Sequence, residues 1–151
     1  LIPIFETMKI LMVCLGNICR SPLAHGIMEF MVKENGLDWE IDSAGTGDWH
    51  VGHAPDKRSI QVAKDRGIDI SGQRAQLFDP AFFSSYDRIL VMDRQNYKDV
   101  VSMAASQEEK DKVTLFLDND IVPDPYYDSN MFIPVFELIE SRCKQLIKDW
   151  A

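Results

Sequence analysis

The sequence predicts an α/β fold: a small, doubly wound (Rossmann-like) domain built on a four-stranded parallel sheet with helices on both faces. Two observations lead to this fold class. Four short apolar runs alternate along the chain with segments of helical periodicity, which is typical of a parallel sheet with right-handed crossover helices. The chain has 151 residues, a length that suits a single domain with a sizeable core.

The first strand is expected at residues 9–13, where KILMV forms a continuous apolar run. A helix should follow it, with Ser21 as the N-cap, Pro22 as the first helical residue and Gly36 as the stop. Its apolar side chains recur at helical spacing and are Leu23, Ile27, Phe30 and Met31.

The rest of the chain continues this alternation. Further strands are expected at residues 39–44, 86–92 and 113–117. Further helices are expected at residues 56–66, 94–105 and 131–150. The last helix should bury one apolar face, made of Phe136, Ile139, Cys143, Leu146, Ile147 and Trp150. Irregular loops are expected at residues 45–55 and 118–129.

Residues 1–7, LIPIFET, are expected to be an upstream extension outside the fold. They precede Met8 and lack the basic region and cleavage pattern of a signal peptide. Residues 8–151 should then form one domain, because no linker, repeat or low-complexity tract interrupts them. No apolar run in the sequence is long enough to cross a membrane.

Charge and cysteine content narrow the class of protein. A net charge of −8 argues against nucleic acid or an anionic membrane as the main partner. The three cysteines do not make a disulfide framework in a domain of this length. We therefore expect a cytoplasmic protein that is a monomer or a weak dimer.

The segment CLGNICRSP, residues 14–22, has the features of an anion site. It joins a strand to a helix N-terminus, which offers free N–H groups and the positive end of the helix dipole. Gly16 and Asn17 tolerate the left-handed backbone that turns such amides inward. Arg20 supplies a planar fork of donors for two phosphate oxygens. The fold prediction therefore includes a phosphate-binding loop after the first strand.

Cys14 would lie at the bottom of this loop, where the amides, the dipole and the guanidinium all favour its thiolate. A thiolate below a bound phosphoryl group is placed for in-line attack, and Ser21 can donate a hydrogen bond to it. Taken singly, Cys14 is better explained as a buried core cysteine. The preceding strand and the Arg-Ser-Pro at the helix start are what favour a nucleophile.

Ligands of open α/β sheets bind at the carboxyl ends of the strands. The loops that begin at Cys14 and near Ser43, and the loop that contains Asp124, should therefore open on one edge. Asp124 is also a suitable turn former before Pro125. A calcium loop is not expected, because Val122 stands where a ligand is needed.

These segments resemble the low-molecular-weight protein tyrosine phosphatases, from residue 8 to about residue 150. The strongest are VCLGNICRSP at 13–22, DSAGTGDWHVG at 42–52, YDRILVMDRQN at 86–96 and VPDPYYD at 122–128. The loop near the N-terminus and the distant Asp-Pro-Tyr form a very specific pair.

The resemblance implies that Cys14 forms a phosphocysteine, Arg20 clamps the phosphate, and Asp124 acts first as general acid and then as base. The other expected phosphate-binding residues are Leu15, Gly16, Asn17, Ile18, Cys19 and Ser21. Asn17 and Ser43 are expected to hold the shape of the loop. The expected walls of an aromatic crevice are Trp49, Tyr126 and Tyr127. No metal or other cofactor is implied.

The chain departs from the family pattern at three positions. His25 stands where the family often has glutamate, and Gln73 and Gln76 stand where it often has histidine and arginine. These changes leave the core chemistry intact. Cys19 has two open interpretations, a small apolar residue under the helix or a redox partner of Cys14.

The expected function is therefore a protein tyrosine phosphatase that acts on a phosphotyrosine-containing protein, with a bacterial tyrosine kinase as a candidate substrate. An arsenate reductase would need more cysteines than Cys143, which lies on an apolar helix face. Protein-arginine phosphatases of this type carry threonine where Ile18 stands. A non-catalytic phosphotyrosine-binding module would need neither Cys14 nor Asp124.

Overall fold

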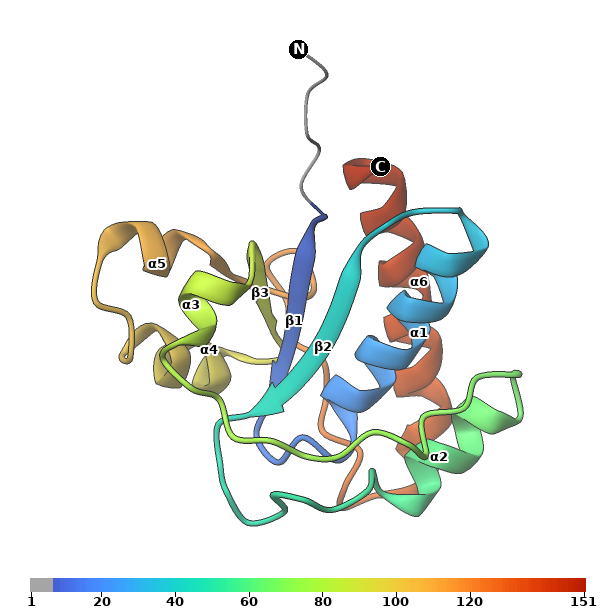
Figure 1. Ribbon diagram of the computed structural model, residues 1–151. Coiled ribbons are helices and arrows are strands. Elements are labelled where there is room, and N and C mark those ends of the chain that lie inside the picture. The colour runs from blue at the N-terminus through green and yellow to red at the C-terminus, as the bar shows by residue number, and fades with distance from the viewer. Residues whose placement is uncertain (1–6) are drawn as a thin grey trace.

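The computed structural model describes residues 7–151 and contains one four-stranded sheet in the order β2-β1-β3-β4. The strands are β1 (Lys9–Cys14), β2 (Glu40–Gly45), β3 (Arg88–Val91) and β4 (Val113–Leu115). All three neighbouring pairs are parallel, with Met12 of β1 opposite Ser43 of β2 and Leu90 of β3. The predicted α/β fold is confirmed (Figure 1). The predicted extension at residues 1–7 lies outside the described residues except for Thr7.

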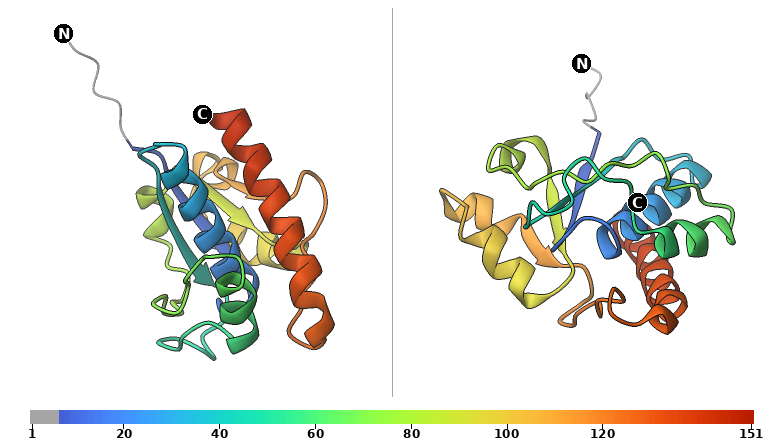
Figure 2. Two further views of the ribbon diagram at one scale, coloured as in Figure 1. Left: turned by 90° about the vertical axis from the view of Figure 1, so that its right-hand side faces the viewer. Right: turned by 90° about the horizontal axis from the view of Figure 1, so that it is seen from below.

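Helices cover both faces of the sheet (Figure 1). One face carries α1 (Arg20–Glu34), α2 (Lys57–Lys64) and α6 (Phe132–Trp150), and the left panel of Figure 2 views the molecule from this side. The other side carries α3 (Phe82–Ser85), α4 (Arg94–Val101) and α5 (Gln107–Asp111). A short 3-10 helix, η1 (Ser129–Met131), leads into α6.

The first strand is apolar at every position after Lys9 because it is buried on both faces. Ile10 and Met12 pack in the cluster under α1 and α6, whereas Leu11 and Val13 pack in the cluster on the α4 side. All four side chains are fully buried. Burial on both faces is why the strand lacks the polar alternation of a half-exposed strand.

The main corrections to the predicted elements concern helix ends. The first helix begins at Arg20 after an N-cap at Cys19, so Ser21 is not the N-cap and Pro22 is the third helical residue. Ser21 does not cap because its hydroxyl is engaged by Cys14 and Asn17. Phe30, expected on the apolar face, is 40% exposed.

The predicted helix at 94–105 ends early, at Val101, and a separate helix, α5, follows after a turn. Ser106 caps α5 by accepting from the N–H of Glu109, so a new helix begins here and α4 does not continue. The sequence analysis also missed α3, a single turn over residues 82–85. Within residues 7–151, no helix has the length and apolar character of a membrane span.

Candidate active site

A cavity of about 270 Å³ lies at the carboxyl ends of the strands. These strand ends are at the lower end of Figure 1 and face the viewer in the right panel of Figure 2. Its lining comes from three loops: Cys14, Leu15, Gly16, Ile18, Cys19, Arg20, Trp49, His50, Asp124, Tyr126 and Tyr127. The structure thus brings together most of the residues that the sequence analysis selected. Asn17, Ser21 and Ser43 do not line the cavity, and they lie behind it as buried residues.

The floor of the cavity is the loop between β1 and α1. Asn17 lies at φ 56°, a left-handed conformation that asparagine tolerates, and its side chain fixes the turn. Its Nδ2 donates to Ser21 Oγ (2.8 Å), and its Oδ1 accepts from the backbone N–H of Gln76 (3.0 Å). Gly45 lets the loop approach β2, because a Cβ there would lie 2.8 Å from the carbonyl oxygen of Leu15. Sequence and packing thus hold this loop in one curled shape.

Cys14 ends β1, and its sulfur lies 3.0 Å from Ser21 Oγ. The residue is only 3% exposed, and the exposed part faces the cavity. A hydroxyl at this distance stabilises a thiolate by donating to it. The sulfur is therefore held below the space that the loop encloses.

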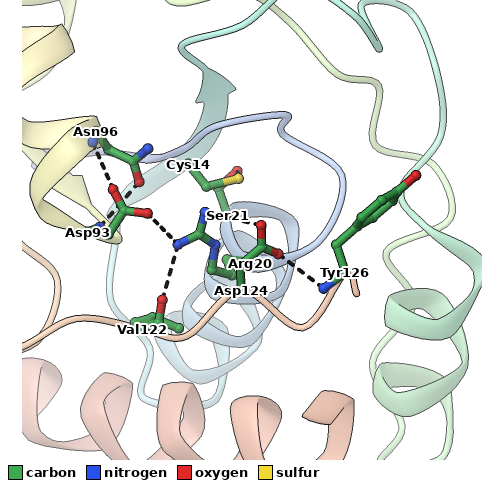
Figure 3. Close-up of polar contacts among 8 residues, drawn as sticks. All are labelled: Cys14, Arg20, Ser21, Asp93, Asn96, Val122, Asp124 and Tyr126. Carbon is green, nitrogen blue, oxygen red and sulfur yellow. Dashed lines mark hydrogen bonds and ion pairs between the residues drawn. The ribbon is translucent and has the colours of Figure 1, made fainter. Parts of the chain in front are cut away.

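Arg20 is the first residue of α1 and is nearly fully buried. Its Nη1 donates to Asp93 Oδ2 (2.7 Å) and to the carbonyl oxygen of Val122 (3.1 Å), as Figure 3 shows. Burial alone would lower the pKa of Arg20, but the negative charge of Cys14 and the hydrogen bond to Asp93 outweigh it and raise the pKa. Within residues 7–151, Nη2 and Nε of Arg20 make no hydrogen bond, and Nη2 lies 3.8 Å from Asp124 Oδ2, so both nitrogens can donate to an anion in the cavity.

Asp124 reaches the cavity from the loop after β4. Its Oδ1 accepts from the backbone N–H of Tyr126 (3.1 Å), and its Oδ2 lies 3.8 Å from Arg20 Nη2. In Figure 3 the carboxyls of Asp93 and Asp124 lie on opposite sides of the Arg20 guanidinium, and Cys14 lies above it. The Asp124 side chain is 35% exposed, so its carboxyl can exchange protons with water.

The mouth of the cavity is aromatic. Trp49 is 67% exposed, and its ring lies over Gly47, where any Cβ would clash with it. Tyr126 and Tyr127 meet edge to face, with ring centroids 5.0 Å apart. Tyr127 is 90% exposed, and together with Trp49 and Tyr126 it lines the cavity with aromatic surface.

Two residues near the site were missed. Asp93 follows β3 and orients Arg20, while its other oxygen caps α4 by accepting from the N–H of Asn96. Its position at the carboxyl end of the clearest predicted strand was the signal that could have identified it. His50 lines the cavity, and its ring lies where a Cβ on Gly16 would be 3.2 Å away.

The three departures from the family pattern lie together behind the loop. His25 Nδ1 is 3.1 Å from Ser43 Oγ, and its Nε2 is 3.3 Å from Glu29. Gln76 Nε2 donates to the carbonyl oxygen of Ser43 (2.9 Å). Ser43 is therefore connected to the phosphate loop indirectly, through its carbonyl oxygen and Gln76, whose backbone N–H donates to Asn17 Oδ1. Gln73 donates to the carbonyl oxygen of Pro22 instead.

The three cysteines differ in reactivity. Burial raises the pKa of Cys19 and Cys143 well above the ordinary value, so both remain thiols at neutral pH. We expect iodoacetate at pH 7 to label Cys14 alone, at one group per chain, and inorganic phosphate to protect it. Peptide mass spectrometry would measure this, and labelling of Cys19 at the same rate as Cys14 would contradict it.

Residues 9–151 match the family described as low molecular weight phosphotyrosine protein phosphatase. The slr0328 protein of Synechocystis sp. is 41% identical over 149 residues, which cover 93% of this chain and 94% of the relative. The low molecular weight protein-tyrosine-phosphatase YfkJ of Bacillus subtilis is 37% identical over 146 residues, 92% of this chain and 93% of the relative.

Solved structures agree with these relatives. The crystal structure of YfkJ superposes with a TM-score of 0.89 at 32% identity and covers 96% of this chain and 95% of its own. Vibrio vulnificus Wzb, solved in complex with benzylphosphonate, gives a TM-score of 0.86 at 28% identity and covers 95% and 99%. Given this agreement along nearly its whole length, the chain belongs to the low molecular weight phosphotyrosine protein phosphatase family.

Proposed function

We propose that Cys14, Arg20 and Asp124 carry the protein tyrosine phosphatase activity of this chain, through a phosphocysteine intermediate. The observation that carries this assignment is the convergence of the three side chains on one cavity from two separate loops, the β1–α1 loop with Cys14 and Arg20 and the loop after β4 with Asp124. A thiolate, a fixed guanidinium and a partly exposed carboxyl are the groups that a two-step phosphoryl transfer needs.

In the first step the phosphate of the substrate occupies the loop, and Cys14 attacks phosphorus in line with the tyrosine oxygen. The sulfur–phosphorus bond forms as the oxygen–phosphorus bond breaks, and Asp124 gives its proton to the departing oxygen. The loop amides and the free side of Arg20 stabilise the charge on the equatorial oxygens. The products are free tyrosine in the substrate protein and phosphocysteine.

In the second step water attacks the phosphocysteine from the face that the tyrosine has left. The Asp124 carboxylate accepts a proton from this water while the sulfur–phosphorus bond breaks. The electron pair returns to Cys14 as a thiolate, with Ser21 Oγ 3.0 Å away to donate to it. Inorganic phosphate leaves, and the enzyme is ready for another cycle.

The depth of the site favours phosphotyrosine over shorter phosphorylated side chains. Cys14 lies at the floor of the cavity, while Trp49, Tyr126 and Tyr127 stand at its mouth. A phenyl ring spans that distance and stacks on the aromatic walls. The relative from Vibrio vulnificus was solved with benzylphosphonate, an aromatic phosphonate, which supports an aromatic phosphate ester as the ligand here.

The alternative functions on this fold are less well supported. An arsenate reductase passes a disulfide along several cysteines, but Cys143 is fully buried within α6. Ile18 lines the cavity where a protein-arginine phosphatase carries threonine. A binding module would gain nothing from Asp124 beside Arg20.

We also propose that residues 8–151 form a single phosphatase domain, since one sheet and its helices account for them. Residues 1–7 are proposed to be an extension outside it. A bacterial tyrosine kinase is the proposed substrate, because the relatives compared include bacterial proteins that cover over nine-tenths of this chain. We propose a cytoplasmic monomer or weak dimer, in keeping with three free cysteines.

Replacing Asp124 by asparagine tests the acid role. We expect kcat/KM for phenyl phosphate to fall about 10²–10³-fold, because phenolate is a poor leaving group without a proton. The loss with p-nitrophenyl phosphate should be smaller, since nitrophenolate leaves readily.

Asp128→Asn is the matched control, because Asp128 lies on the same loop and caps η1 by accepting from the N–H of Asn130. Asparagine caps helices as well as aspartate does, so both substrates should react at wild-type rates. Equal losses with the two substrates in Asp124→Asn would contradict a role in leaving-group protonation.

A further inference from the structure

We propose that Arg58 is a positioning residue that holds the Asp124 carboxyl at the site. Arg58 lies in the first turn of α2 and belongs to neither loop that carries a reacting group. The proposal rests on the proposed function, in which Asp124 protonates the leaving group. It concerns how that acid is held in place, and the chemistry of the acid is unchanged by it.

The link from Arg58 to the acid runs through one residue. Arg58 Nη2 donates to the carbonyl oxygen of Tyr126 (3.0 Å), and the N–H of Tyr126 donates to Asp124 Oδ1 (3.1 Å). Pro125 lies between the two and fixes its own φ, so the segment has few ways to move without breaking a bond. The backbone of Tyr126 therefore transmits the position of the guanidinium to the carboxyl.

Arg58 is itself held from the side of the phosphate loop. Asp56 binds it in a two-point pair, with Nε to Oδ1 at 3.0 Å and Nη2 to Oδ2 at 2.9 Å. The backbone N–H of Asp56 donates to the carbonyl oxygen of Ile18 (2.8 Å), a residue of the phosphate loop. The Arg58 hydrogen bond holds the pKa of Asp56 below its ordinary value, so the pair stays charged. The floor and the acid of the site are thus joined by one bridge, Ile18–Asp56–Arg58–Tyr126–Asp124.

Three further contacts fix the plane of the guanidinium. Its carbon lies 4.5 Å from the ring centroid of Phe132, the first residue of α6, and 5.6 Å from that of Tyr126. Nη1 donates to Ser129 Oγ (3.0 Å). Lysine has a single ammonium and cannot bind a carboxylate at two points, a carbonyl and a hydroxyl from one plane. Position 58 therefore requires an arginine, because a lysine cannot make this set of contacts.

This geometry predicts which step depends on Arg58. Without Arg58, the backbone segment 124–126 loses the hydrogen bond that joins it to α2. A small displacement of a catalytic group lowers its contribution steeply. The value of kcat/KM should therefore fall only for substrates whose leaving group needs a proton. Phosphate should still bind to the loop and to Arg20.

The test measures kcat/KM for phenyl phosphate and p-nitrophenyl phosphate with Arg58→Gln and Arg58→Lys. We expect each variant to lose about 10-fold with phenyl phosphate and less than about 3-fold with p-nitrophenyl phosphate. The inhibition constant of inorganic phosphate should remain within about 2-fold of wild type. In an Asp124→Asn background, the same substitutions should change either rate by less than about 2-fold.

Arg66→Gln is the matched control. Arg66 lies over Phe136 of α6 at 4.6 Å and pairs with Glu137 at 3.6 Å, and its side chain is 34% exposed against 35% for Arg58. It offers the same kinds of contact to α6, but its ring contact and ion pair are with residues of that helix. We expect wild-type rates with both substrates, which separates positioning of Asp124 from general loss of packing.

Equal losses with both substrates, or a full 10-fold loss that persists in the Asp124→Asn background, would overturn the positioning role. A different failure would point to the proposed function itself: if Asp124→Asn alone shows no preference between leaving groups, Asp124 is not the acid. The single Asp124 variant therefore tells the two failures apart.

Discussion

Replacing Cys14 by serine should reduce kcat by about 10⁵-fold, the largest effect expected for any single substitution in this protein. A serine hydroxyl ionises far less readily than a thiol, and within residues 7–151 no histidine or carboxylate is hydrogen-bonded to this atom to act as a base. The neighbour at 3.0 Å is Ser21 Oγ, which can donate to an anion but cannot remove a proton. The loop would therefore keep its shape and lose its nucleophile.

Binding and turnover should separate in this variant. Titration calorimetry with a phosphotyrosine peptide should give an affinity close to that of wild type, because the loop amides and Arg20 remain. Cys143→Ala is the control, since Cys143 is a fully buried cysteine of α6, and it should keep wild-type kcat. Turnover that survives in Cys14→Ser would show that another residue is the nucleophile. Wild type that binds the peptide without turnover would restore the binding-module interpretation.

The second large effect is expected for Arg20→Lys, which should lower kcat/KM by about 10³-fold. One guanidinium nitrogen of Arg20, Nη1, donates to Asp93 and Val122, and the other side of the guanidinium can bind the phosphate. A single ammonium cannot meet both demands, so either the carboxylate of Asp93 or the phosphate loses its partner. The inhibition constant of inorganic phosphate should rise along with the loss of rate.

Thermal unfolding distinguishes this chemical effect from damage to the fold. Asp93 keeps a positive partner in Arg20→Lys, and its side chain is 24% exposed, so the free energy of unfolding should fall by no more than about 1–2 kcal/mol. Arg142→Lys is the control, because Arg142 also donates to a buried backbone oxygen, that of Phe116, and lies outside the site. A rate loss in Arg20→Lys with unchanged phosphate inhibition would contradict the clamp.

The sequence predicted the fold and the floor of the site because both depend on local patterns. A continuous apolar run identified β1, and the Gly-Asn pair before an Arg-Ser-Pro indicated a curled loop at a helix start. The family resemblance then selected Asp124, which lies in a loop of ordinary turn composition. Local chemistry alone left that residue open, since any aspartate before a proline forms a turn.

The features that the sequence analysis missed depend on contacts between distant segments. Ser21 was predicted as the N-cap, but its hydroxyl is bound by Cys14 and Asn17, and the helix begins two residues earlier than predicted. Asp93 caps α4 with one oxygen, and its second oxygen orients an arginine 73 residues away in sequence. Such double roles appear only when the loops meet in three dimensions.

The strand order β2-β1-β3-β4 has a consequence for the protein while it is being synthesised. A nascent chain emerges from its N-terminus, so β1, α1 and β2 can pair while the segments that carry Asp93 and Asp124 do not yet exist. The reactive cysteine is therefore made long before its acid. We therefore expect the new chain to hydrolyse a phosphate ester only after β3 has paired with β1 and β4 has paired with β3.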